Sequence, residues 1–161
     1  MDKTRPIIFV MVAVALYFSF VVFNNLTDYA TNARNVNSVL SMEQIKSDGV
    51  KWRAISNPVI IQSAYHLIIL IEALTAAMGW SAVFYLQVKP ELLRGHILAV
   101  TALALGFALF FIGFFIVGGE WFYMWQHPLL GGLQTKALLI SLFLLTAMVF
   151  VINSLQEPQN G

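Results

Sequence analysis

The sequence predicts an all-α membrane protein: a bundle of four transmembrane helices with a partly helical outer loop between the first and the second. Hydrophobic residues make up 59% of the 161 residues and charged residues only 11%, against about 45–50% and about 25% in soluble domains. Four apolar runs each reach the roughly 20 residues that a helix needs to cross the hydrocarbon core. Lipid offers the backbone no hydrogen-bond partners, so we expect these runs to be helical.

Composition also excludes several classes of function. The chain contains no cysteine, which excludes disulfides, thiolate metal sites and cysteine-bound iron–sulfur clusters. Its net charge of +1 leaves no broad basic surface, so we expect no nucleic-acid partner. The length predicts a single domain, residues 1–161. No metal site and no catalytic residues are predicted.

The first apolar run is interpreted as a retained membrane span. The charged start, residues 1–5, is typical of a signal peptide, but the run from Pro6 to Phe23 is longer than the about 7–15 residues of a signal core. It ends in two asparagines, Asn24 and Asn25, rather than in a small-residue cleavage site. With this run included, the expected spans are about residues 6–24, 58–86, 92–118 and 133–154.

The outer loop, residues 25–57, is the only sizeable polar segment. Residues 41–44 (Ser-Met-Glu-Gln) have the form of a capping box, which predicts the start of a short helix. Residues 47–49 (Ser-Asp-Gly) are expected to end it. Asn57 followed by Pro58 predicts an N-cap with proline at the first helical position of the second span.

The third span carries small residues at helical spacing. Ala102 and Gly106 form a small-xxx-small pair, and Gly113 lies one heptad further along the same face. Small residues let the backbones of neighbouring membrane helices approach closely. We therefore expect this face to pack against another helix.

Four spans place both termini on the same side of the membrane. If the termini are inside, the inner basic residues are Lys3, Arg5, Lys89 and Arg94, and the outer side carries more basic residues than the inner side. The inner ones are concentrated in short segments at span ends, where the positive-inside bias is strongest. We expect both termini in the cytoplasm.

Glu72 lies near the centre of the second span, where a charge costs at least about 2.5–3.5 kcal/mol. It shares a helical stripe with Tyr65, Ala76 and Gly79, which should face the bundle. One hypothesis is a proton or cation site. The other, which we prefer, is a buried carboxyl that determines helix packing, because no further ionisable groups continue inward from it.

Two histidines raise the alternative of haem b between helices. Such a haem needs two imidazoles at matching depth, and His66 with His127 comes closest. His127, however, adjoins Pro128 in an interfacial loop. Ordinary histidines are the preferred interpretation, and no cofactor is predicted.

The stretch from Gly118 to Gln126 is rich in aromatic residues, as expected of a belt at the membrane interface. An ion pair of Arg53 with Glu120 or Asp28 would hold the outer loop over the bundle, and Trp52 offers Arg53 a cation–π contact. We prefer this structural role to a ligand site. The candidate structural or binding residues are Asn25, Asp28, Tyr29, Trp52, Arg53, Glu72, Glu120, Trp121, Trp125 and Gln126.

The sequence resembles the bacterial DUF2165 family over nearly its whole length. The resemblance is carried by residues 24–29 (NNLTDY), 52–55 (WRAI), 72–76 (EALTA) and 118–126 (GGEWFYMWQ). It implies a four-helix protein of the inner membrane of Gram-negative bacteria, without an established activity. The order of long and short loops is also claudin-like, which is an analogy of architecture only.

The leading functional hypothesis is a non-catalytic accessory or assembly subunit of a larger membrane complex, with a respiratory complex as one candidate. Its expected partners are the lipid bilayer and other membrane-protein subunits. The alternative is a protein that binds or transports a small ligand, a lipid or quinone, or protons, with a site between Glu72 and the outer aromatic residues. A haem-carrying membrane anchor is the third hypothesis.

Overall fold

The computed structural model describes residues 4–88 and 91–156. These residues form helices and no strands. The long helices are α1 (Thr4–Thr27), α3 (Pro58–Leu86), α4 (Leu92–Phe107) with its direct continuation η3 (Ala108–Trp121), and α5 (Gly131–Gln156). They provide four segments long and apolar enough to cross a membrane. The predicted four-helix, all-α architecture is confirmed.

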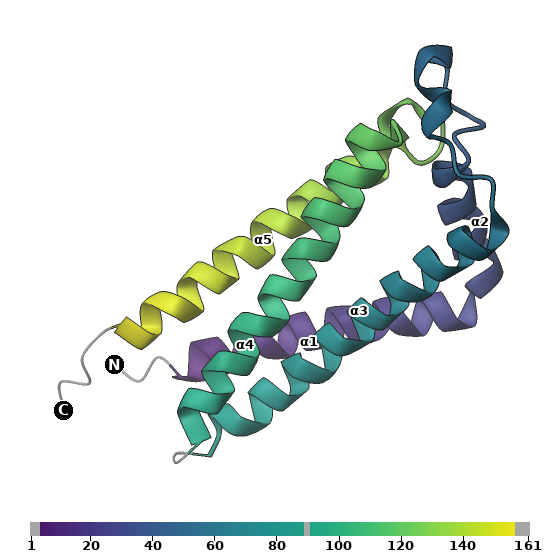
Figure 1. The fold of residues 1–161 in the computed structure, drawn as a ribbon. Coiled ribbons are helices and arrows are strands. Elements are labelled where there is room, and N and C mark those ends of the chain that lie inside the picture. Colours follow the sequence, from purple (N-terminus) through teal and green to yellow (C-terminus); the bar gives the residue numbers. More distant parts are fainter. Residues whose placement is uncertain (1–3, 89–90, 157–161) are drawn as a thin grey trace.

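The four spans are packed mainly in the order α1, α3, α4, α5, with α5 also lying along η3. The start of α1, the end of α3 and the start of α4 lie at one end of the bundle, here called the inner end (Figure 1). From this end α3 and the α4–η3 helix diverge toward the opposite, outer end (Figure 1). The outer polar segment lies across this divergence.

The core of the bundle includes residues of all four spans, and α1, α4 and α5 meet within it. Phe18, Leu103 and Leu144 come from these three helices and are at most 1% exposed. A Cβ atom at Gly106 would lie only 2.7 Å from Cζ of Phe18, so glycine is what allows this approach. The packing role predicted for Gly106 is confirmed. The one predicted for Gly113 is wrong, because a Cβ atom there would meet only Leu109 of its own helix, at 3.7 Å.

Helix α3 begins as the sequence predicts. Oδ1 of Asn57 accepts a hydrogen bond from the backbone nitrogen of Val59 at 2.9 Å, and Pro58 occupies the first helical position. The stripe containing Tyr65, Glu72 and Gly79 is buried against the bundle. The polar residues of this stripe therefore face protein rather than lipid.

The third span changes its winding half-way. From Ala108 to Trp121 it is a π-helix, in which each N–H bonds to the carbonyl five residues earlier, a geometry seen mostly as single turns, often at functional sites. Phenylalanine rings four residues apart stack along this segment: Phe107 with Phe111 at 5.2 Å and Phe111 with Phe115 at 5.5 Å. The span runs to Trp121, three residues beyond the predicted end.

The outer cap consists of α2 (Tyr29–Leu40), η1 (Asp48–Arg53), η4 (Met124–Gln126) and the loops that join them. Backbone hydrogen bonds continue across Asp28: its nitrogen donates to the oxygen of Asn24, and its oxygen accepts from the nitrogen of Asn32. Helix α2 therefore bends away from α1 without a loop between them. The cap has a small hydrophobic core made of Val39, Met42, Ile45, Phe122, Met124 and Leu130.

The predicted capping box at residues 41–44 is wrong. Ser41 instead ends α2, and Met42 adopts a left-handed backbone with φ of 54°. The Met42 side chain is 1% exposed within the core of the cap, and this burial offsets the local cost of a left-handed residue. Residues 47–49 begin η1 rather than ending a helix.

Candidate functional site

A hydrogen-bonded group joins α1 to α3 in the outer half of the bundle. Glu72 is 2% exposed, and its Oε2 accepts a hydrogen bond from Nδ2 of Asn25 at 2.6 Å. The hydroxyl of Tyr65 donates to the backbone oxygen of Asn25 at 3.0 Å and lies 3.3 Å from its Oδ1. The partner of the buried carboxyl is thus a neutral carboxamide.

Tyr29 extends this group toward the surface. Its hydroxyl is hydrogen-bonded to Nε2 of His66 at 2.8 Å, and its ring lies 5.0 Å from that of Tyr65. Both contacts attach the first turn of α2 to α3. Asp28 immediately precedes Tyr29 and is exposed, and its carboxylate forms no hydrogen bond or ion pair within the described part of the chain.

Arg53 lies among aromatic rings at the outer surface. Its guanidinium carbon is 4.6 Å from the ring centre of Trp121, 5.4 Å from that of Trp52 and 5.5 Å from that of Tyr123. Its Nη1 also donates to the backbone oxygen of Trp121 at 3.3 Å. The expected ion pair with Glu120 or Asp28 is absent from the described residues. Cation–π contacts of Arg53 to Trp121 and Tyr123 hold η1 against the end of η3 instead.

The other predicted residues of the cap contact different partners. Oε1 of Glu120 accepts a hydrogen bond from Nε2 of Gln134 on α5 at 2.8 Å, which explains why this carboxylate does not meet Arg53. Nε2 of Gln126 donates to the Ser47 hydroxyl at 2.8 Å. Trp125 is 52% exposed, as expected of an aromatic belt. These contacts support a structural role for the cap.

His127 attaches the far end of α2. It is 6% exposed, and its Nε2 lies 2.8 Å from the hydroxyl of Ser38. Its Nδ1 accepts hydrogen bonds from the backbone nitrogens of Leu129 and Leu130 at 3.2 and 3.1 Å. These bonds require Nδ1 to be unprotonated, so the ring is neutral and carries its proton on Nε2. Burial lowers the pKa of His127 below its ordinary value.

This arrangement predicts that acid weakens the cap. The pKa of His127 is lower in the folded protein than in the unfolded chain, so the unfolded chain binds the proton more readily. The contribution of His127 to the stability of the fold is therefore complete above about pH 6.5 and decreases as the pH falls below it. We expect His127→Gln to lose less stability, or to gain more, than the wild-type protein when the pH is lowered from 7.5 to 5, as measured by the melting temperature. An unchanged slope in His127→Gln would contradict this assignment.

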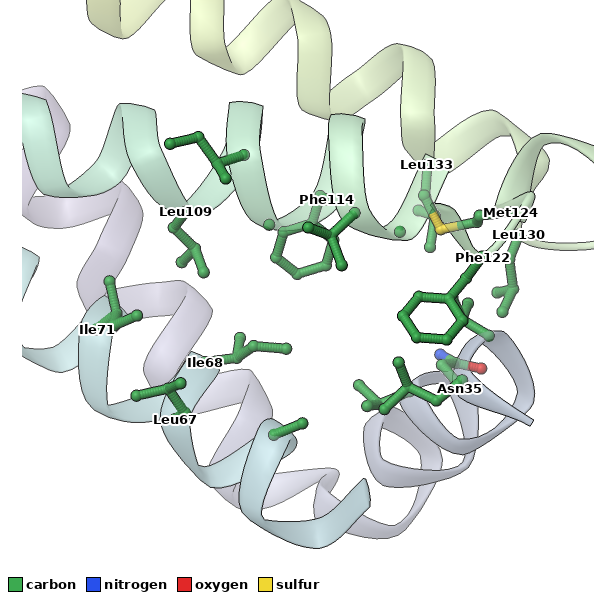
Figure 2. A pocket seen from close by; sticks show the side chains of 18 of the residues that line it. Asn35, Leu67, Ile68, Ile71, Leu109, Phe114, Phe122, Met124, Leu130 and Leu133 are labelled. Carbon is green, nitrogen blue, oxygen red and sulfur yellow. The ribbon is translucent and has the colours of Figure 1, made fainter. Parts of the chain in front are cut away.

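An apolar cavity of about 450 Å³ lies beneath α2, where α3 and η3 diverge. Figure 2 shows Ile68 and Ile71 on one wall, Leu109 and Phe114 on the other, and Phe122 at the outer end. The remaining lining residues are Asn35, Val36, Val39, Leu40, Ala64, Leu67, Leu105, Ala108, Ile112, Gly113, Val117, Gly118, Met124, Leu130 and Leu133. Gly113 lines this cavity, which explains the open space at its Cα.

The cavity is open at the side of the bundle that faces lipid. Leu67, Ile112 and Val117 line it and are also 40–55% exposed. Glu72 is not among its lining residues, because its carboxyl group faces Asn25 of α1. The region expected between Glu72 and the outer aromatic residues is therefore divided into a polar group on one face of α3 and an apolar cavity on another.

Comparison with known families identifies the chain. The family described as predicted small integral membrane protein (DUF2165) matches residues 6–154. The chain belongs to the DUF2165 family. Searches of curated proteins and of solved structures gave no significant match. The family description gives an integral membrane location, and the four spans of this DUF2165 protein agree with it.

The two histidines considered for haem do not form a matched pair in this DUF2165 protein. His66 is hydrogen-bonded to Tyr29 at the start of α2, and His127 to Ser38 near its end. Nine residues of helix separate the two hydroxyl partners along α2, which corresponds to about 13 Å. Both ring nitrogens of His127 are engaged within the cap, so the residues present do not fit a haem between these imidazoles.

Sequence reasoning missed the residues that line the cavity. They are ordinary apolar residues, and nothing in their pattern separates cavity walls from lipid-facing positions. The one available signal was glycine: Gly113 follows the heptad of a packing face yet lies in a phenylalanine-rich segment. Its spacing from Ala102 and Gly106 predicts close packing rather than a cavity wall.

Proposed function

We propose that this protein binds a membrane-soluble apolar molecule in the cavity between α2, α3 and η3. The observation that supports the proposal is a volume of about 450 Å³ lined almost entirely by hydrocarbon and open toward lipid. This volume lies within the roughly 300–1,000 Å³ of small-molecule sites. The lining residues carry no charge, hydroxyl or imidazole, so the proposed role is binding rather than catalysis.

The position of the cavity supports entry from the bilayer. Leu67 and Ile112 lie on the two walls and are both more than half exposed, so a molecule dissolved in lipid reaches the cavity without crossing water. The outer end is covered by α2 and by the core of the cap, including Phe122. A bound molecule would therefore be protected from the aqueous side while its other end remains in the bilayer.

Filling the cavity tests the proposal. Gly113→Leu adds a side chain where a Cβ atom meets only Leu109, at 3.7 Å, so we expect the fold to persist while uptake of an apolar probe falls at least tenfold. The measurement is equilibrium binding of a pyrene-labelled alkane to protein in lipid nanodiscs.

Ile116→Phe is the matched control, because it enlarges a residue on the same π-helix that is exposed and does not line the cavity. It should bind the probe like the wild-type protein. Equal binding by wild-type protein and Gly113→Leu would overturn the proposed function.

The role of an accessory subunit stays a prediction. The lipid-facing sides of the spans carry large exposed residues such as Phe9, Phe20 and Phe84, and these suit contacts with lipid and with other subunits equally. Location in the bacterial inner membrane and cytoplasmic termini also stay predictions. Co-purification from mild detergent extracts of native membranes tests the association with other subunits.

A further inference from the structure

One polar side chain lines the otherwise apolar cavity. Asn35 lies on α2, and Figure 2 shows its carboxamide at the outer end of the cavity beside Phe122. No hydrogen bond of this carboxamide forms with any residue in the described ranges 4–88 and 91–156. The neighbouring polar residues differ in this respect: Nδ2 of Asn32 donates to the backbone oxygen of Asp28, and the Ser38 hydroxyl contacts His127.

A carboxamide without a partner in apolar surroundings has chemical consequences. The side chain of Asn35 is half-buried; its carboxamide offers two N–H donors and one acceptor oxygen, and leaving these unpaired where they face the cavity carries a free-energy cost. An occupant with a hydrogen-bonding oxygen at this end removes that cost, whereas a plain hydrocarbon does not. In a bilayer this difference determines selectivity, because lipid chains are themselves as apolar as the cavity walls.

The charge of the surroundings restricts the occupant further. Among the described residues, no lysine or arginine lines the cavity: Nη2 of Arg34, the basic residue nearest in sequence to Asn35, contacts the Thr31 hydroxyl at 3.1 Å, and Arg53 lies among the aromatic rings of the cap. A phosphate or carboxylate would therefore lose its hydration without gaining a cation, which is strongly unfavourable. An uncharged head group fits these surroundings.

We propose that the cavity holds a neutral single-chain lipid whose head is a hydroxyl or carbonyl oxygen hydrogen-bonded to Asn35. The inference rests on the proposed function and specifies the class of ligand. On α3 the lining residues run from Ala64 to Ile71, which corresponds to about 10 Å of helix. The first part of the chain lies along this wall, and the remainder extends past Leu67 and Ile112 into the bilayer.

The test compares three probes that share a sixteen-carbon chain: hexadecanol, hexadecane and hexadecyl phosphate. Each competes with the pyrene-labelled alkane for wild-type protein in nanodiscs. We expect hexadecanol to compete about 2- to 10-fold better than hexadecane, as one neutral hydrogen bond predicts, and better than hexadecyl phosphate. Equal competition by hexadecanol and hexadecane, or a preference for the phosphate, would overturn the inference.

Variants locate the head group. Asn35→Leu should equalise hexadecanol and hexadecane, whereas Asn37→Leu, at an exposed position of α2 outside the cavity, should keep the wild-type preference. A preference that survives in Asn35→Leu would overturn the assignment of the head group to Asn35. The wild-type comparison stands without any variant, so a folding defect does not remove the test.

The outcomes also separate this inference from the proposed function. If the pyrene-labelled alkane binds and is blocked by Gly113→Leu, but the three competitors act equally, the cavity binds apolar molecules without selecting the head group. If the alkane binds wild-type protein and Gly113→Leu equally, the proposed function itself fails. Farnesol as a fourth competitor distinguishes an isoprenoid chain from an acyl chain.

Discussion

Asn25→Leu is expected to destabilise the bundle by about 2–3 kcal/mol, the upper part of the range for leaving a buried polar group unpaired. The substitution removes the donor that bonds to Glu72 at 2.6 Å and leaves a carboxyl group that is 2% exposed without its partner. Tyr65 loses its 3.3 Å contact to Oδ1 but keeps the backbone oxygen of residue 25 as its acceptor, so Glu72 is the group left without a partner. Reversible unfolding in mixed detergent micelles measures it.

Two further variants separate pairing from packing. Glu72→Gln retains an acceptor oxygen for Asn25 and should change the free energy of unfolding by less than about 1 kcal/mol. The double variant Asn25→Leu/Glu72→Leu removes both polar groups and should recover most of the stability, because an apolar pair of similar shape can be nearly neutral. A double variant that is less stable than Asn25→Leu would contradict the assignment of the lost stability to an unpaired Glu72.

Gly106→Leu is expected to cost about 1–3 kcal/mol or more, the range found for overpacked cores. The first added carbon would lie 2.7 Å from Cζ of Phe18 and 3.1 Å from Cδ1 of Leu144. Both side chains are at most 1% exposed, so neither has space into which to move. We expect a lower melting temperature and a loss of monodisperse protein in size-exclusion chromatography.

The matched control for this prediction lies seven residues later. Gly113→Leu makes the same chemical change on the same span, where the new side chain enters the cavity. It should leave the melting temperature within a few degrees of wild type or raise it, because glycine is a poor helix former. Similar destabilisation by both substitutions would contradict the assignment of one glycine to packing and the other to the cavity.

The outer cap connects these local features to the proposed function. Helix α2 covers the cavity and is held at its start by Tyr29 and His66 and near its end by Ser38 and His127. Acid that protonates His127 adds the proton at Nδ1 and removes the bonds from Leu129 and Leu130, in the loop that carries the second attachment. The His127→Gln measurements therefore also report how firmly the cavity is covered.

The sequence by itself determined the class of fold and the spans. Lipid leaves backbone groups without outside partners, so a long apolar run has one available structure, and composition is enough to recognise it. The start of α3 at Asn57 and Pro58 was predictable for a similar reason, because an N-cap depends on neighbouring residues only. Gly106 was also predictable, since small residues on a membrane helix serve close approach.

Only the tertiary structure decided what the polar residues of the outer half contact. Glu72 bonds to Asn25, which lies 47 residues away in sequence, and Arg53 meets the rings around Trp121 rather than a carboxylate. The fold also placed Gly113 and Asn35 on one cavity. These outcomes depend on how α3 and η3 diverge and on how α2 crosses between them. Such long-range geometry leaves no periodic pattern in the sequence, because packing and hydrogen bonding act between residues that are distant along the chain.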